Sequence, residues 1–123
     1  MGSLEKFGEF VVATFRDTAI DKIDGLLIGR WKAPGLLALQ ADLANMTTEE
    51  HLIVRRCVLE VVDGSLHDFL FALHESHDGD QGIAVIVDGQ NVAALSDGLQ
   101  GELYSDDGWF SRFSKHGPHP SPA

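Results

Sequence analysis

Acidic and histidine side chains recur at helical spacing in the middle of the chain. This stripe consists of Glu60, Asp63, His67 and His74, which lie within about 60° of one another around an α-helix. A histidine beside a carboxylate can act as a general base, and histidines with carboxylates can bind a divalent metal ion. However, His67 and His74 are two helical turns apart, about 10 Å along the axis, whereas a single-helix metal motif needs positions i and i+4. The stripe therefore predicts a solvated polar helix face or, as the alternative, a small metal-binding protein or hydrolase.

A second candidate site combines acids with aromatic side chains near the C-terminus. We predict that a partner is bound by Asp97, Glu102, Tyr104, Asp106, Asp107 and Trp109. Aromatic side chains supply anchor area at interfaces, and flanking carboxylates complement a basic partner. The alternative is that the aromatic side chains belong to the core and that the acids only keep the protein in solution.

The charges of the chain are distributed unevenly. The formal net charge is -10, and no lysine or arginine lies between Arg56 and Arg112, a stretch that contains eleven acids. Such a distribution creates a negative potential that steers association with cationic partners. Nucleic acids and anionic membranes are bound mainly through Lys and Arg, so the charge argues against both as partners.

Sequence motifs narrow the classes of site further. The chain has no P-loop, no GxGxxG after a predicted strand, no GxSxG and no zinc pattern of cysteines and histidines. Cys57 is the only cysteine, and its apolar neighbours predict a buried, inert thiol. The N-terminal residues lack the apolar core of a signal peptide, and no uncharged stretch is long enough to span a bilayer. We expect a cytoplasmic protein without a cofactor, with an enzyme of scattered active-site residues as the alternative.

The apolar periodicity predicts two long amphipathic helices and a short one. The long helices cover Leu4 to Asp24 and Thr48 to Ser76, and the short one covers Pro34 to Asn45. Thr47 and Glu50 have the spacing of a capping box at the start of the second long helix. Arg16 falls on the polar side of the first helix when every residue turns by 100°.

A small antiparallel β-hairpin is predicted after the helices. Ile83 to Val87 and Asn91 to Leu95 read as its strands, and Asp88 and Gly89 as its turn. A turn is also predicted at residues 78–82. Residues 117–123 contain three prolines and are predicted to form a disordered tail. The fold class is therefore α+β and mainly helical, with a single globular domain over residues 1–116.

The C-terminal block from Ser96 to Phe110 resembles the tail of small bacterial proteins, some of which are similar to the immunity proteins of polymorphic toxin systems. The resemblance covers the last third of the chain and implies a bacterial protein that neutralises a toxin by binding to it.

The charge distribution and this resemblance lead to one hypothesis of function. We expect a non-catalytic acidic binding protein whose carboxylates occupy the cationic surface of a basic protein partner. Pairing of helix faces between subunits, which would give a homo-oligomer, is a further alternative.

Overall fold

The computed structural model describes residues 1–78, without the side chain of Asp78, and residues 82–120. Its elements in chain order are α1 (Ser3–Val11), the π-helical segment η1 (Val12–Asp17), α2 (Thr18–Leu27), α3 (Pro34–Ala44), α4 (Thr48–Asp78), β1 (Ile86–Val87), β2 (Gln90–Asn91), the 3-10 segments η2 (Val92–Leu95) and η3 (Leu99–Leu103), and α5 (Trp109–Phe113). The architecture confirms the predicted α+β, mainly helical fold. The turn predicted at 78–82 lies largely outside the described residues.

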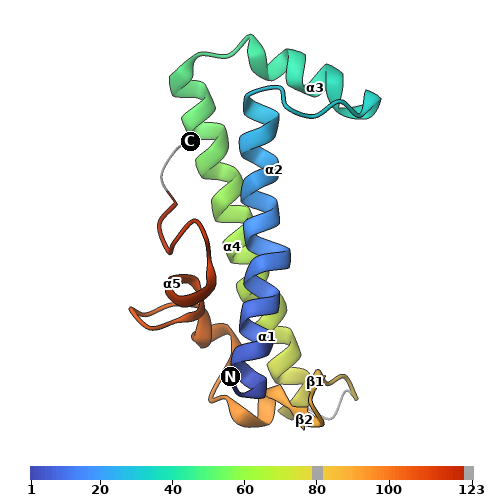
Figure 1. Ribbon diagram of the computed structural model, residues 1–123, viewed down its shortest axis with the longest axis vertical. Helices are drawn as coiled ribbons and strands as arrows, with labels where there is room; N and C mark the ends of the chain where they lie inside the picture. Colours follow the sequence, from blue (N-terminus) through green and yellow to red (C-terminus); the bar gives the residue numbers. More distant parts are fainter. Residues whose placement is uncertain (79–81, 121–123) are drawn as a thin grey trace.

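Two long helical rods form the frame of the molecule. α1, η1 and α2 run as one rod antiparallel to α4, and α3 crosses the end where the two rods are joined (Figure 1). Two ion pairs fix the register: Arg16 Nε lies 2.8 Å from Asp63 Oδ1, and Arg55 Nε lies 2.6 Å from Asp24 Oδ1. In both pairs the residue numbers add up to 79. Between these two pairs, residues 16–24 of the first rod therefore lie level with the α4 residues whose numbers are 79 minus their own.

The start of α4 is a capping box, as predicted. Thr47 Oγ1 accepts a hydrogen bond from the backbone N–H of Glu50 at 3.1 Å, and the Glu50 carboxylate accepts one from the N–H of Thr47 at 2.9 Å. This reciprocal pair satisfies two N–H groups that a helix start leaves without partners. It also holds the pKa of Glu50 below its ordinary value, because both the backbone and the side chain of Thr47 stabilise the carboxylate.

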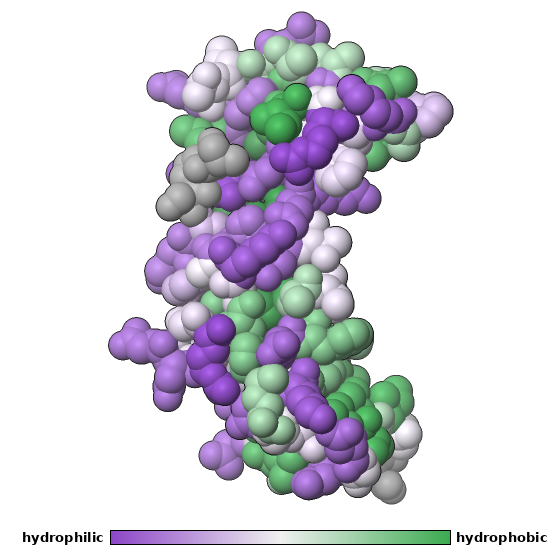
Figure 2. Space-filling model, in the orientation of Figure 1, coloured by the Kyte–Doolittle hydropathy of each residue, from purple (hydrophilic) through white to green (hydrophobic). Residues whose placement is uncertain are grey.

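The hydrophobic core lies at the hairpin end of the rods, under the part of the chain that follows the hairpin, residues 92–120, which we call the C-terminal segment. The buried cluster consists of Phe7, Val12, Leu66, Leu70, Val92, Ala93, Leu99, Leu103, Trp109 and Phe110. Trp109 packs edge-on against Phe7, with ring centroids 6.0 Å apart, and covers Gly8. Figure 2 shows hydrophobic residues reaching the surface towards both ends of the molecule, and a hydrophilic band across its middle.

The β-hairpin is shorter than predicted. Asp88 and Gly89 form the turn, both with positive φ, which is the signature of a type I′ hairpin. The ladder contains only Ile86 with Asn91 and Val87 with Gln90. The predicted second strand ends early because Val92 and Ala93 turn inward as 3-10 helix and are buried in the core. The Asn91 side chain accepts a hydrogen bond from the N–H of Ala93 and begins that helix.

The prediction of a buried Cys57 is wrong, because its thiol is exposed. The apolar arc of α4 is wider than the side that other elements cover. Leu66 and Leu70 are buried, while Val61 remains 66% exposed. Cys57 lies on the uncovered side of the helix.

In the part of the chain that the structure describes, no helix combines the length and the apolar character needed to cross a membrane.

The predicted tail is only partly described. Residues 117–120 lie along the rods, whereas residues 121–123 fall outside the described residues. The disorder of the tail and the domain boundary stay predictions.

A matched pair of glycine substitutions tests this packing. A Cβ at Gly8 would lie 2.4 Å from a Trp109 ring atom, whereas a Cβ at Gly64 would meet nothing within 4 Å. We expect Gly8→Ala to destabilise the fold by about 1–3 kcal/mol through overpacking. Gly64→Ala should stabilise it by about 1 kcal/mol through helix propensity. Urea unfolding followed by circular dichroism measures both, and equal effects of the two substitutions would contradict the described Trp109 contact.

Candidate functional site

A cavity of about 410 Å³ lies between α4 and the C-terminal segment. It is lined by Glu60, Asp63, Gly64, Leu103, Tyr104, Ser105, Asp106, Phe110, Ser111, Pro118 and His119. We call this cavity the acidic recess. It brings Glu60 and Asp63 of the predicted stripe together with Tyr104 and Asp106 of the predicted partner-binding block.

A tight turn presents the aromatic and acidic side chains of the recess. The N–H of Gly108 donates to the carbonyl of Ser105 at 3.1 Å, and Ser105 has a φ of 73°. A Cβ at residue 108 would lie 1.6 Å from the Tyr104 carbonyl oxygen, so only glycine fits there. The turn leaves Tyr104 47% exposed, with its ring edge-to-face with Phe110 at a centroid distance of 5.8 Å.

The π-helical segment turns Arg16 towards the recess, so its predicted position on the outer polar face is wrong. A π turn holds an extra residue, which displaces the following side chains by about 100° around the axis relative to a continuous α-helix. Thr18 Oγ1 donates to the carbonyl of Ala13, five residues earlier, at 3.2 Å. As a result, the Arg16 side chain is fully buried.

Every polar group of Arg16 is used at the back of the recess. Nε and Nη2 donate to the two carboxylate oxygens of Asp63 at 2.8 and 3.2 Å. Nη1 donates to Ser114 Oγ and to the carbonyl of Gly117, and Nη2 also donates to the carbonyl of Pro118. The guanidinium stacks on the Phe110 ring, with Cζ 3.9 Å from the centroid. Arg16 therefore joins α4, α5 and the C-terminal residues.

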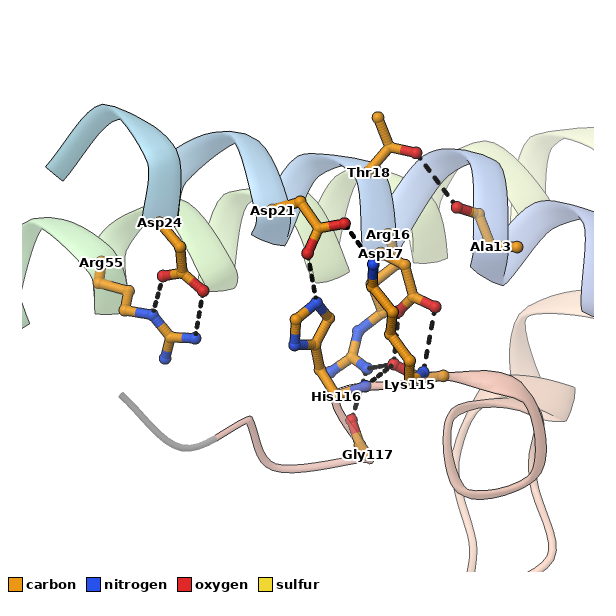
Figure 3. A network of polar contacts seen from close by, with 11 residues as sticks. Ala13, Arg16, Asp17, Thr18, Asp21, Asp24, Arg55, Lys115, His116 and Gly117 are labelled. Carbon is orange, nitrogen blue, oxygen red and sulfur yellow. Dashed lines mark hydrogen bonds and ion pairs between the residues drawn. The ribbon is translucent and has the colours of Figure 1, made fainter. Parts of the chain in front are cut away.

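The residues Ser114 to Pro120 form a strap that runs along the rods (Figure 3). Asp17 accepts hydrogen bonds from Ser114 Oγ at 2.6 Å and from the N–H of Lys115 at 3.1 Å. Asp21 lies 2.6 Å from Lys115 Nζ and 2.9 Å from His116 Nε2. Further along, Arg55 Nη1 donates to the carbonyl of Pro120 at 3.4 Å.

The recess has a negative electrostatic environment. The pKa of Tyr104 is raised by burial and by the carboxylates of Asp63 and Asp68, with Arg16 opposing the shift. Glu60 and Asp106 are exposed, and among the described residues neither takes part in an ion pair. These two carboxylates are available to a ligand, whereas Asp63 is already paired with Arg16.

The other predicted partner-binding residues divide between surface and core. Asp97 and Glu102 line a second cavity of about 420 Å³, and Glu102 accepts a hydrogen bond from Ser96 Oγ at 3.3 Å. Asp107 is exposed and accepts one from Ser105 Oγ at 3.0 Å. Trp109 is only 2% exposed. Its side chain belongs to the core and is not available to a partner.

The two stripe histidines lie outside the lining of the recess. His67 Nδ1 is 3.3 Å from Asp68 Oδ1, and its ring lies 6.0 Å from that of Tyr104. His74 Nδ1 accepts a hydrogen bond from the N–H of Leu99 at 3.3 Å, which ties η3 to α4. Over residues 1–78 and 82–120, no three His, Cys, Asp or Glu side chains form a group that could hold a metal ion.

Sequence reasoning missed Arg16 and the strap residues Pro118 and His119. The available signal was the position of Arg16 directly after the uncharged run from Phe10 to Phe15. A charge at the end of such a run on a core-facing helix needs a buried partner.

Comparisons with protein-family models, with curated proteins and with solved structures each find no match for this chain.

Removal of the Arg16 side-chain charge tests its role. We expect Arg16→Met to lower the free energy of unfolding by about 3 kcal/mol or more, because Asp63 and the strap carbonyls lose their donor. Lys6→Met is the matched control, since Lys6 pairs with Asp88 at the surface with both side chains at least half exposed. It should cost less than about 1 kcal/mol. Equal losses in urea unfolding would contradict the buried network.

The attachment of the strap should depend on pH. The hydrogen bond from Lys115 holds the pKa of Asp21 below its ordinary value of 3.8; burial opposes this shift and His116 adds to it. A lowered folded-state pKa means that the contribution of Asp21 is present above its unfolded pKa and is lost as the pH falls through the folded pKa. We expect Lys115→Ala to raise the Asp21 pKa in an NMR carboxyl titration, while Lys6→Ala leaves it unchanged. An unchanged Asp21 pKa in Lys115→Ala would show that the pair does not form.

Proposed function

We propose that this protein is a non-catalytic acidic binding protein that neutralises a basic protein partner, in the manner of an immunity or inhibitor protein. The observation that carries the proposal is the acidic recess. There, the carboxylates of Glu60, Asp63 and Asp106 line the same cavity as the aromatic residues Tyr104 and Phe110.

This combination suits the cationic side chain of an arginine or lysine. A carboxylate offers charge-assisted hydrogen bonds, and an aromatic face attracts a cation by its quadrupole. The protein already binds one of its own guanidinium groups in this way, because Arg16 contacts both Asp63 and Phe110. The cavity of about 410 Å³ is within the size range of small-ligand sites and accommodates a single long side chain.

The surrounding charge supports capture of a basic protein rather than of a lone amine. Asp97, Glu102 and Asp107 lie on the same C-terminal segment as the recess. Together with the acids of α4 they extend the negative potential beyond the cavity, which accelerates the approach of a cationic surface. Added salt screens this attraction, so the association should weaken as ionic strength rises.

The experiment is a pull-down from the lysate of the source organism with tagged protein at low and at high salt, read by mass spectrometry. We expect a basic protein at low salt and less of it at high salt. The double variant Glu60→Gln/Asp106→Asn should bind that protein about 10-fold more weakly or worse, as loss of central contacts does.

The control variant Asp42→Asn/Glu49→Gln removes the same charge from exposed positions around the connection between α3 and α4. It should change the affinity by no more than about 2-fold, since it alters only the long-range field. Equal weakening by both variants would assign the binding to net charge and not to the recess. Failure to capture any basic protein would contradict the proposed function itself.

A further inference from the structure

α3 is apolar on all its sides and yet largely exposed. Its 11 residues include a single charged side chain, Asp42, and residues 33–41 are uncharged without interruption. Only Gln40 and Leu43 of this helix are buried. A helix that is apolar all round is normally covered on every side, by a protein core or by a membrane. We call residues 33–41 the apolar tip, because α3 projects beyond the rods at one end of the molecule (Figure 1).

The exposed leucines of the apolar tip point in opposite directions. Leu37 is 51% exposed and Leu39 is 45% exposed. Residues two positions apart on a helix point about 200° apart, so these two side chains lie on nearly opposite sides of α3. The surface of a rigid protein partner covers one side of a projecting helix, whereas fluid lipid chains close around all of its exposed sides. The exposure of both leucines therefore fits a membrane interface better than a protein surface.

The loop before α3 fixes the apolar tip in this position. Gly29 has a φ of 71° and ends α2, and the N–H of Arg30 donates to the carbonyl of Gly25 at 2.9 Å. The Gln40 side chain accepts a hydrogen bond from the N–H of Trp31 at 2.9 Å and donates one to its carbonyl at 2.8 Å. The indole of Trp31 covers Gly25. These contacts hold α3 across the end of the rods, where its leucines stay away from the core.

The charges directly before the apolar tip are basic. No acidic residue lies between Asp24 and Asp42, whereas Arg30 and Lys32 immediately precede α3. Both basic residues are exposed, and neither forms an ion pair with any residue that the structure describes. Arginine and lysine beside an exposed apolar helix are attracted to anionic lipid headgroups. The local charge therefore complements the surface of an anionic membrane.

Most acids of the chain are too distant to oppose such a contact. The long acidic stretch begins at Glu60, which lies 12 residues beyond the first residue of α4 and roughly 18 Å along that helix. At physiological ionic strength the potential of a charge decays over about 8 Å. The closer exposed acids Asp42, Glu49 and Glu50 follow the apolar tip, whereas the two bases precede it. The net charge of -10 therefore does not exclude this end of the molecule from an anionic membrane.

We propose that the apolar tip inserts into the interface of a membrane that contains anionic lipids, with Arg30 and Lys32 at the level of the headgroups. α3 lies in the plane of the interface, as short apolar and amphipathic helices do, and the rods point into the water. The acidic recess is lined by residues from Glu60 onwards and stays accessible. The proposal is independent of the proposed function, because it uses different residues.

The test is sedimentation of the full chain with vesicles of phosphatidylcholine alone or mixed with phosphatidylglycerol. We expect binding to the mixed vesicles, weakened by added salt, and weaker binding to phosphatidylcholine alone. Lys32→Gln should lower the partition coefficient about 5-fold, as one basic charge near the headgroups does. Lys6→Gln is the matched control, since Lys6 pairs with Asp88 of the hairpin turn at the other end of the rods. It should change the partition coefficient by less than about 2-fold.

Two leucine variants distinguish a membrane from a protein surface. Leu37→Glu and Leu39→Glu should each lower the partition coefficient about 10-fold or more, because lipid covers both sides of the helix. Val61→Glu adds the same charge at a position that is 66% exposed on α4, outside the apolar tip. It should bind the mixed vesicles as the unchanged chain does. Circular dichroism checks that each variant is folded.

Four outcomes would overturn the proposal. The first is no binding to the mixed vesicles, and the second is equal binding to both kinds of vesicle. The third is a loss in only one of the two leucine variants, because a one-sided surface would then cover α3. The fourth is a dimer in light scattering without lipid that Leu37→Glu converts to the monomer, since a second copy would then cover the apolar tip.

Discussion

The buried guanidinium of Arg16 is the constraint on which the rest of the structure depends. A charge without access to water is tolerated only when it is paired and its donors are all satisfied. Its partners come from α4, from the ring of Phe110 and from the strap. Because one side chain must meet all of them at once, it fixes the positions of α4, α5 and the strap relative to one another.

The same residue shapes the electrostatics of the acidic recess. Arg16 neutralises Asp63 from behind, so the charges that face outward are those of Glu60 and Asp106. Phe110 offers one face to Arg16 and meets the edge-on ring of Tyr104. The cluster thus has two layers: the inner layer holds the fold together, and the outer layer is the part to which the proposed function assigns a cation.

The sequence allowed prediction of features that are set locally, and not of those set by packing. The capping box of Thr47 and Glu50, the start of α3 at Pro34 and the turn at Asp88 and Gly89 depend on neighbouring residues, and all three are present. The inward turn of Arg16 depends on a π-helical segment for which residue types give no rule. The burial of Trp109 and the exposure of Cys57 depend on which side of each helix the C-terminal segment covers. Of the candidate site, Tyr104 and Asp106 were predicted in one group and Glu60 and Asp63 in another, but their meeting in one cavity required the three-dimensional arrangement.

The strap has a consequence for how the chain acquires its fold. Arg16 donates to carbonyls that lie 101 and 102 residues further along the chain, and contacts of such sequence separation are the slowest to form. During synthesis the helix that carries Arg16 emerges long before these carbonyls, which complete its shell. Until then the guanidinium must stay hydrated and the rods cannot close around it. A chain that stops short of Gly117 would therefore keep an incompletely satisfied charge in its centre and be exposed to proteolysis.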